Sequence, residues 1–509
     1  MTLQADQNLF TQIRERITNP NAVLIHSRDG QVVTYSNMLD RSAQFANALA
    51  KLGVVKGDRV AAQVEKSVEA IWLYLACLRV GAVFLPLNTS YTDTELNYFV
   101  SDAEPRVFVC QQDRYEAIEA LARANGVGHV ETLNDDQTGS LFDKADACSK
   151  THTDVVCDGE ELAAILYTSG TTGRPKGAML THENLSSNSK TLVSTWKFSS
   201  SDVLLHALPI FHTHGLFVAT NVTLLSGASM HFHPGFDLSA IVAALPQVTV
   251  MMGVPTFYIR LLSSDELTRE LVENMRLFVS GSAPLSSDTH RQFEQRTGHT
   301  ILERYGMTET NMNTSNPYDG ERRAGTVGFA LQGVEIRVAD PETGGQLADG
   351  EIGSIEIRGS NVFKGYWRKP EKTAAEFRDD GFFISGDLGF IDEKGYLNIS
   401  GRGKDLIISG GFNVYPAEVE NAIDGIAGIN ESAVIGVPHP DFGEGVTAVV
   451  ATSIENTPDA KDIKAVLTNE LAGYKLPKQI FYVEALPRNK MGKVQKNVLR
   501  ERYKATYNK

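Results

Sequence analysis

The chain contains 509 residues with a mass of 55.7 kDa, of which 42% are hydrophobic and 22% are charged. These proportions are typical of a globular protein with more than one domain, and they exclude a disordered, collagen-like or coiled-coil chain. The 48 Lys and Arg residues against 62 Asp and Glu residues give a net charge of −14, which disfavours a general nucleic-acid or anionic-membrane binder but still permits small anionic ligands.

The cysteine pattern indicates a reducing compartment. Four cysteines in a chain of this length, with no CxxC pair and no metal-ligand spacing, are too few for a disulfide framework. The first ten residues lack the basic and apolar segments of a secretory signal, and Arg79 interrupts the most apolar stretch, Ala70–Leu87. We therefore expect a cytoplasmic protein with no membrane insertion and no nucleic-acid partner. The cysteines are Cys77, Cys110, Cys148 and Cys157.

Helical and strand-like patterns alternate along the first part of the chain. The sequence predicts helices over Leu39–Leu52 and Val68–Arg79, and strands over Arg59–Val64, Val83–Pro86 and Arg106–Cys110. The alternation continues to about residue 320. It predicts an α/β fold in which helices cover a largely parallel sheet.

The pattern changes to short β-rich runs at about residues 325–400. Val334–Val338, Gly353–Arg358 and Tyr396–Ile399 are separated by glycine-containing turns, which is typical of an antiparallel or barrel-like subdomain. Near Gly401–Asp405 we expect a boundary between a domain of residues 1–403 and a small domain of residues 404–509. The end of the small domain, Leu486–Lys509, is locally basic.

The strongest chemical signal is the segment Tyr167–Gly177, with the sequence YTSGTTGRPKG. An apolar run, Leu162–Tyr167, leads into a loop of glycines and hydroxyl residues that ends near Lys176. Glycines let the backbone approach an anion, and the hydroxyls and the lysine add donors and positive charge. The alternative is a flexible surface loop. The segment therefore predicts a polyphosphate cradle, although it is neither a Walker A motif nor a GxGxxG motif.

This loop resembles the signature of the adenylate-forming enzymes, which include acyl-CoA synthetases, nonribosomal peptide adenylation domains and luciferases. Further blocks of that family follow in order, and they are Leu208–His212, Tyr305–Glu309, Ser385–Asp387, Gly401–Asp405, Gly410–Pro416 and Pro487–Lys493. The resemblance implies a large N-terminal domain of mixed or parallel sheets with helices and a β-rich subdomain. It also implies a small mobile C-terminal α+β domain.

The resemblance also implies ATP and Mg²⁺ sites. Tyr305 offers a flat face for adenine, Asp387 can accept both ribose hydroxyls, and Glu309 can hold Mg²⁺ together with substrate phosphates. The alternatives are a core tyrosine, a turn aspartate and a solvated acid. The nucleotide-binding residues implied are Thr168, Ser169, Gly170, Thr171, Thr172, Gly173, Lys176, Tyr305, Thr308, Asp387 and Arg402.

By the same resemblance, Lys493 is the catalytic cation. An ammonium between a carboxylate and an α-phosphate offsets their repulsion mainly in the transition state. Lys404 matches the hinge of the small domain, and Gly410 and Gly411 match the wall of a tunnel for the pantetheine arm of coenzyme A. His212 is a gate or an orienting group, or else a core histidine. Because acetylation would remove the charge of Lys493, a lysine acetyltransferase is an expected regulatory partner.

The substrate acid is indicated by two arginines and a serine. Arg260, Arg304 and Ser282 occupy segments that line the acid site in the family, and a buried guanidinium grips a carboxylate in bidentate fashion. The alternative is that the arginines pair with Glu303 or Glu309. Residues 276–283, 303–315 and 487–499 resemble malonyl-CoA synthetases, so we expect malonate as the substrate. Methylmalonate differs by one methyl group, and the sequence leaves open whether it is a second substrate.

The predicted reaction joins malonate to coenzyme A through a malonyl-adenylate and releases pyrophosphate and AMP. A short-chain monocarboxylate or aromatic acyl-CoA synthetase is the alternative, and the two arginines argue against it. A non-catalytic nucleotide-binding protein is disfavoured because Lys493 and Glu309 are both present. An oxygen-dependent, luciferase-type oxidase shares the fold, and only CoA-dependent AMP release without oxygen would distinguish it.

Overall fold

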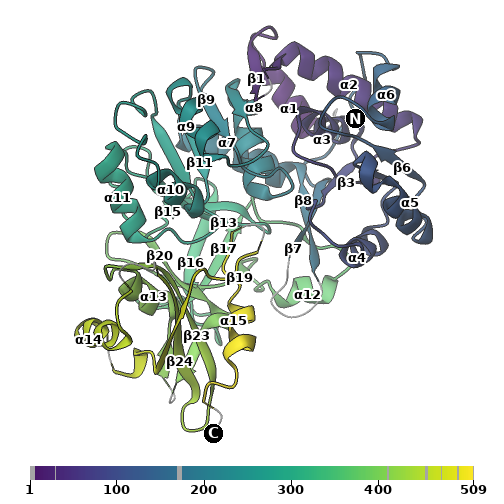
Figure 1. The fold of residues 1–509 in the computed structure, drawn as a ribbon. Helices are drawn as coiled ribbons and strands as arrows, with labels where there is room; N and C mark the ends of the chain where they lie inside the picture. Colours follow the sequence, from purple (N-terminus) through teal and green to yellow (C-terminus); the bar gives the residue numbers. More distant parts are fainter. Residues whose placement is uncertain are drawn as a thin grey trace.

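The computed structural model describes residues 6–28, 30–168, 175–409, 412–452, 457–471, 473–489 and 492–507. Figure 1 shows a large upper part, coloured purple through teal to green, and a lower lobe, coloured yellow-green to yellow, that contains the end of the chain. The lower lobe is built from residues beyond β20 (Leu397–Arg402). Among the described residues, no helix is long and apolar enough to cross a bilayer.

The first sheet of the upper part has seven strands in the order β18-β8-β7-β4-β3-β5-β6. Its central strands are parallel, and β8 and β18 add an antiparallel edge beside β7. The predicted parallel sheet is therefore confirmed. Its strands are β3 (Arg59–Gln63), β4 (Val83–Pro86), β5 (Val107–Cys110), β6 (His129–Thr132), β7 (Leu162–Thr168), β8 (Lys176–Thr181) and β18 (Gly365–Tyr366).

Helix α3 (Val68–Val80) lies in the core beside this sheet, and every one of its residues is buried. Ser67 caps its first turn by accepting a hydrogen bond from the Ala70 amide, and Gly81 ends it at φ +69°, a conformation that glycine adopts without strain. The other helices of this region are α1 (Leu9–Arg16), α2 (Tyr35–Lys51), α4 (Asp93–Ala103), α5 (Tyr115–Ala124), α6 (Ser140–Asp146) and α12 (Pro370–Ala375).

The second sheet has nine strands in the order β15-β14-β13-β12-β11-β9-β10-β1-β2. Its strands are β1 (Val23–Ser27), β2 (Val32–Thr34), β9 (Val203–His206), β10 (Ser229–Phe232), β11 (Val250–Gly253), β12 (Leu277–Ser280), β13 (Leu302–Met307), β14 (Asn311–Ser315) and β15 (Phe329–Ala330). The helices that follow or precede them are α7 (His182–Thr195), α8 (Asn221–Ser226), α9 (Leu238–Ala244), α10 (Pro255–Leu262) and α11 (Ser287–Thr297).

Strands β11, β12 and β13 of this sheet are parallel neighbours. The carboxyl ends of parallel strands meet at one edge, which is where ligands bind in open α/β sheets. The segments after Gly253 and Ser280 and the end of β13 therefore lie together. This edge holds most of the predicted acid-binding residues.

The expected β-rich region forms a four-stranded antiparallel sheet in the order β16-β17-β19-β20. Besides β20 it consists of β16 (Val334–Ala339), β17 (Gly353–Gly359) and β19 (Phe383–Ile391). Asp387 of β19 and Arg402 of β20 are direct cross-strand partners, so the register of the sheet sets two predicted nucleotide residues side by side.

The lower lobe is an α+β unit with a mixed sheet and its own apolar clusters. Its strands are β21 (Ile407–Ser409), β22 (Phe412–Val414), β23 (Ile429–His439), β24 (Gly443–Thr452) and β25 (Gln479–Val483). Its helices are α13 (Pro416–Asp424), α14 (Ala460–Glu470) and α15 (Lys496–Tyr503). The exact boundary at residues 403 and 404 stays a prediction.

Candidate active site

Arg304 of β13 is buried, and no carboxylate among the described residues pairs with it. Its side chain lies in the interior with 2% of its residue surface exposed, and among the described residues no hydrogen-bond partner reaches Nε or Nη2. Burial lowers the pKa of this guanidinium to about 9. The expected alternative of an ion pair with Glu303 or Glu309 does not occur within the described part of the chain: Oε2 of Glu303 has no hydrogen-bond partner there, and Glu309 contacts Thr168 and Tyr366 instead. A buried cation without a partner destabilises the folded protein, and an anionic ligand would supply the missing partner.

Ser282 and two histidines lie next to this guanidinium. Ser282 has φ +72°, an uncommon backbone conformation for serine, and its Oγ is 3.3 Å from Nδ1 of His214. His214 belongs to η2 (His214–Thr220), and its buried Nε2 has no hydrogen-bond partner among the described residues. Burial lowers the pKa of both His214 and His212, and the charge of Arg304 adds to both shifts. The predicted acid site therefore contains buried polar atoms that have no hydrogen-bond partner within the described part of the chain.

His212 is neutral at physiological pH. Burial, with Lys493 and Arg304, lowers its pKa to about 3. Its Nδ1 lies 3.2 Å from the backbone nitrogen of His214 and accepts that hydrogen bond, so the ring proton resides on Nε2. The segment is fixed further by His206, whose Nε2 is 3.0 Å from the Gly215 carbonyl. His212 thus presents an N–H donor rather than a positive charge.

Arg260 does not lie where its apolar neighbours suggested. The expectation of a buried guanidinium is wrong, because Arg260 is exposed on α10 and its Cζ lies 5.7 Å from the Phe236 ring centroid. The apolar run before it faces the core only in part, and Ile259 is also exposed. Arg260 does share a helix face with Thr256, one turn earlier, which borders the cleft.

Lys493 of the lower lobe lies in the site formed by the upper part. A Cβ atom on its neighbour Gly492 would be 3.7 Å from Oγ1 of Thr256, so this segment contacts α10. Lys493 stays accessible to solvent, but protein surrounds it on several sides. This partial desolvation and the nearby Arg402 lower the pKa of its ammonium, while Asp387 and Glu309 oppose the shift. The lysine of the lower lobe therefore lies near charged groups of the upper part, namely Arg402, Asp387 and Glu309.

Tyr305, Asp387 and Arg402 form one hydrogen-bonded group. The Tyr305 hydroxyl donates to Oδ2 of Asp387 at 2.5 Å, and Nε of Arg402 contacts Oδ1 of the same carboxylate at 2.8 Å. Burial and Asp387 raise the pKa of Tyr305. Each carboxylate oxygen keeps a further lone pair, so the group can still accept hydroxyl donors from a ligand.

Glu309 provides a carboxylate suited to one hard cation. It is buried, and its Oε1 lies 3.4 Å from Oγ1 of Thr168 and 3.1 Å from the Tyr366 hydroxyl. Burial raises its pKa. The described residues contain no cluster of three or more His, Cys, Asp or Glu that would hold a metal alone. A single carboxylate suits Mg²⁺, which takes its other ligands from phosphates and water.

Lys176 is paired with a residue that the sequence did not indicate. Its Nζ lies 3.0 Å from Oε1 of Glu376, the residue that caps the end of α12, and 4.0 Å from the centroid of the Tyr366 ring. No motif marked Tyr366 or Glu376, and no signal in the sequence would have placed them beside Lys176.

The remaining predicted residues divide into two groups. Thr308 is half-buried in the turn between β13 and β14, and Lys404 is exposed in η4 (Gly403–Asp405). The others lie outside the described residues, so their predicted roles stay untested. They are Ser169, Gly170, Thr171, Thr172, Gly173, Gly410 and Gly411.

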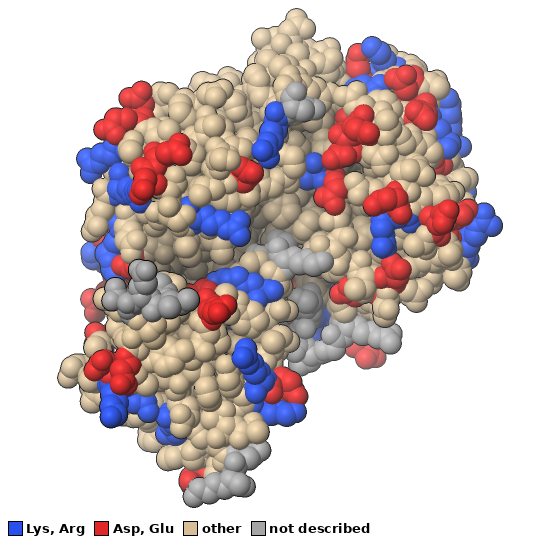
Figure 2. All heavy atoms as spheres, in the orientation of Figure 1, with Lys and Arg blue, Asp and Glu red and all other residues tan. Residues whose placement is uncertain are grey.

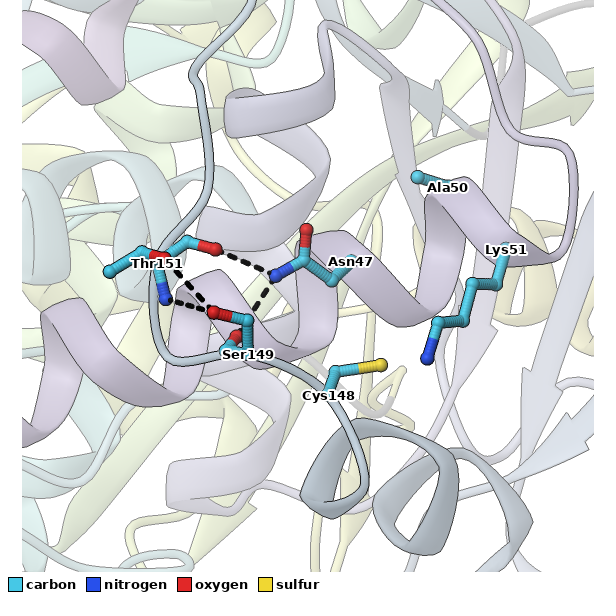
Figure 3. Close-up of a pocket in the computed structure, with 6 residues that line it drawn as sticks. All are labelled: Asn47, Ala50, Lys51, Cys148, Ser149 and Thr151. Atoms are coloured by element: carbon cyan, nitrogen blue, oxygen red, sulfur yellow. Dashed lines mark hydrogen bonds between the residues drawn. The ribbon is translucent and has the colours of Figure 1, made fainter.

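The molecular surface agrees with this location of the site. Figure 2 shows a hollow between the upper part and the lower lobe, with Lys and Arg side chains along its borders. A separate hollow of about 520 Å³ lies between α2 and the segment after α6 (Figure 3). Asn47 donates to the Ser149 and Thr151 carbonyls there at 2.9 Å each. No predicted site residue lines this second hollow, so we assign it no chemistry.

Comparisons with known proteins identify the family. The model for the AMP-binding enzyme matches residues 14–367, and the model for the AMP-binding enzyme C-terminal domain matches residues 418–493. The chain therefore belongs to the family of AMP-binding enzymes.

Several members of this family resemble the chain along most of its length. Malonate–CoA ligase of Arabidopsis thaliana is 35% identical, and the match covers 88% of this chain and 78% of the ligase. Feruloyl-CoA synthase of an Amycolatopsis species is also 35% identical, and the match covers 96% of this chain and 98% of the synthase. ATP-bound MatB from Rhodopseudomonas palustris is 57% identical over 99% of this chain and 100% of its own, with a TM-score of 0.97. Against the apo form of MatB the TM-score is 0.87.

Proposed function

We propose that the protein is an AMP-forming acid–CoA ligase that joins malonate to coenzyme A. The malonate–CoA ligases of Arabidopsis thaliana and mouse, at 35% and 34% identity, support this assignment, as does the 57% identity to MatB. ATP and coenzyme A are the other substrates, and Mg²⁺ is the cofactor. Methylmalonate is a second substrate in this proposal, because one methyl group changes binding by only about 1–3 kcal/mol.

The buried Arg304 carries the choice of substrate. A monocarboxylate or an aromatic acid would leave its guanidinium desolvated and unpaired, whereas the second carboxylate of malonate supplies a charged partner. Ser282 and His214 add polar atoms beside it. In this proposal Arg260 stands at the mouth of the pocket and attracts the dianion from solvent.

In the first half-reaction, a malonate carboxylate oxygen forms a bond to the α-phosphorus of ATP and pyrophosphate leaves. Lys493 offsets the repulsion between the two anions, and Lys176 meets the departing phosphates. Tyr305, Thr308, Asp387 and Arg402 hold the nucleoside and its α-phosphate, together with Thr168 and the residues of the glycine-rich loop. When bound by Glu309, Mg²⁺ neutralises phosphate charge and orients the leaving group.

In the second half-reaction, the CoA sulfur bonds to the malonyl carbonyl carbon and AMP leaves. We propose that the lower lobe rotates about Lys404 between the two steps and that Gly410 and Gly411 then border the pantetheine tunnel. The present arrangement, with Lys493 in the site, corresponds to the first step. The higher TM-score against ATP-bound MatB than against apo MatB supports this correspondence. Because His212 is neutral, it can orient the malonyl group as a hydrogen-bond donor without forming an ion pair with the malonyl carboxylate.

Two further expectations belong to the same proposal. A cytoplasmic location is supported by four free cysteines, all buried. Regulation by a lysine acetyltransferase is supported by the solvent accessibility of Lys493. Both stay predictions.

The deciding experiment is a pyrophosphate-release screen with malonate, methylmalonate, succinate, acetate, butyrate and ferulate. We expect release with malonate to exceed that with acetate, butyrate or ferulate by at least about a hundredfold, because these monocarboxylates leave Arg304 unpaired. Preference for butyrate or ferulate would remove the malonate assignment and favour the alternative that the feruloyl-CoA synthase relative represents. CoA-dependent AMP release in the absence of oxygen separates the ligase from an oxidase.

A further inference from the structure

Glu376 and Tyr366 connect two residues of the site that are far apart in the sequence. Glu376 Oε1 is 3.0 Å from Nζ of Lys176, and its Oε2 is 2.6 Å from the Tyr366 hydroxyl. That hydroxyl is also 3.1 Å from Oε1 of Glu309. One phenol oxygen therefore lies between the carboxylate assigned to Mg²⁺ and the carboxylate that binds the phosphate lysine.

The Tyr366 ring adds a second contact to the same lysine. Nζ of Lys176 lies 4.0 Å from the ring centroid, within the range of a cation–π interaction. The ring also packs against Phe363, with centroids 4.8 Å apart in an edge-on arrangement. Lys176 thus has a charged partner and an aromatic face, which together restrict an otherwise flexible four-carbon side chain.

Backbone pairing explains why these residues meet. Tyr366 of β18 pairs with Ala178 of β8, two residues after Lys176, and the amide of Trp367 donates to the Gly177 carbonyl. The Tyr366 amide donates to Oγ1 of Thr373 in α12 at 2.9 Å, which ties the strand to the helix that Glu376 ends. The contacts therefore rest on a fixed frame rather than on mobile surface side chains.

We propose that Tyr366 and Glu376 are positioning residues that hold the Lys176 ammonium and the Glu309 carboxylate in the arrangement required by the ATP triphosphate. The inference rests on the proposed function, because it takes Lys176 as the phosphate contact and Glu309 as the Mg²⁺ ligand. Without Lys176 beside it, the Glu376 carboxylate would repel an incoming polyphosphate. The pair therefore acts on the β- and γ-phosphates, while AMP, which lacks them, is bound independently of it.

The test compares binding of MgATP and AMP by calorimetry in Tyr366→Phe and Glu376→Gln. Tyr366→Phe keeps the ring beneath Lys176 and removes only the hydroxyl. Loss of a hydrogen bond to a charged group corresponds to roughly a 10- to 100-fold change in an equilibrium constant. We expect each variant to weaken MgATP binding by about that factor and to change AMP binding less than about twofold.

Lys372→Gln is the matched control. Lys372 also lies 3.0 Å from Oε1 of Glu376, but its side chain is 45% exposed and such surface pairs contribute little. We expect this variant to bind MgATP and AMP as the unaltered protein does. The double variant Tyr366→Phe/Glu376→Gln should lose less than the sum of the single losses, because both changes remove the same hydrogen bond.

Equal losses of affinity for MgATP and AMP would show a merely structural role and would overturn the inference. Unchanged MgATP binding in both variants would also overturn it. If Tyr366→Phe melts at a lower temperature, the binding data of Glu376→Gln decide between the two outcomes. The Glu376 side chain stands at the end of a helix and is 20% exposed, so its replacement disturbs the fold less. Failure of the unaltered protein to bind MgATP would instead contradict the proposed function. The two failures are therefore distinguishable in one set of titrations.

Discussion

The guanidinium of Arg304 lies directly against the backbone of Gly281. A Cβ atom added at Gly281 would be 2.4 Å from Cζ of Arg304, closer than any real non-bonded contact. Gly281 follows β12, and Arg304 stands on the neighbouring strand β13. The absence of a side chain at Gly281 therefore leaves room for the Arg304 guanidinium in the proposed acid pocket.

Replacing Gly281 by alanine should displace this guanidinium. We expect Gly281→Ala to raise KM for malonate at least about tenfold, because a charged hydrogen bond to the substrate is lost, and to leave KM for ATP within about twofold. Steady-state kinetics with each substrate varied in turn measure both constants. Gly235→Ala is the control, since a Cβ atom there meets nothing within 4 Å. Equal effects of the two substitutions would contradict the relationship.

Replacing Arg304 by methionine should separate function from stability. The substitution removes the partner of the second carboxylate, so kcat/KM for malonate should fall by about a hundredfold or more. The same substitution removes a desolvated cation that has no partner among the described residues, so the ligand-free protein should melt at a higher temperature. Thermal melts without ligand and turnover with malonate measure the two effects. A lower melting temperature together with intact malonate turnover would contradict both expectations.

Arg260 should behave differently because it is exposed. We expect Arg260→Leu to raise KM for malonate several-fold, to reduce the dependence of KM on ionic strength, and to leave the melting temperature unchanged. The measurement is KM for malonate at low and high salt. Malonate kinetics identical to those of the unaltered protein would exclude Arg260 from substrate binding.

The buried carboxyl of Glu303 predicts a pH dependence of stability. Burial raises its pKa from 4.5 to about 8 in the folded protein. Between these values the folded state keeps a proton that the unfolded state releases, so this contribution to stability is complete below pH 4.5 and is lost as the pH rises through about 8. Glu303→Gln cannot ionise, so it should lose less stability than the unaltered protein between pH 5 and pH 9. Parallel melting curves of the two proteins would contradict the shift.

Much of the fold was predictable because its signals are local. The helix predicted over Val68–Arg79 is found over Val68–Val80, since Ser67 and Gly81 mark its ends in the sequence. The strand predicted at Val83–Pro86 is found at the same residues. The order of the strands was not predictable, because the placement of β4 between β7 and β3 depends on contacts between segments far apart in the chain.

The residues of the site were predictable where a short motif of the family marks a single functional role. Asp387 and Arg402 stand in short motifs of the family, and they meet across two strands. The exposure of Arg260 was not predictable, because an apolar run does not show which helix face meets the core. Tyr366 and Glu376 carry no motif, and only the pairing of β18 with β8 places them beside Lys176.

The position of Lys493 in the cleft leads to the most direct test of the account. We expect Lys493→Ala to slow malonate-dependent pyrophosphate release by at least about a hundredfold, because a positioned cation acts chiefly in the transition state. Lys504→Ala is the control, as Lys504 is an exposed lysine of the same lobe that pairs with Glu501. The account predicts normal release by Lys504→Ala and nearly none by Lys493→Ala. Malonyl-AMP formation at the unaltered rate in Lys493→Ala would contradict it.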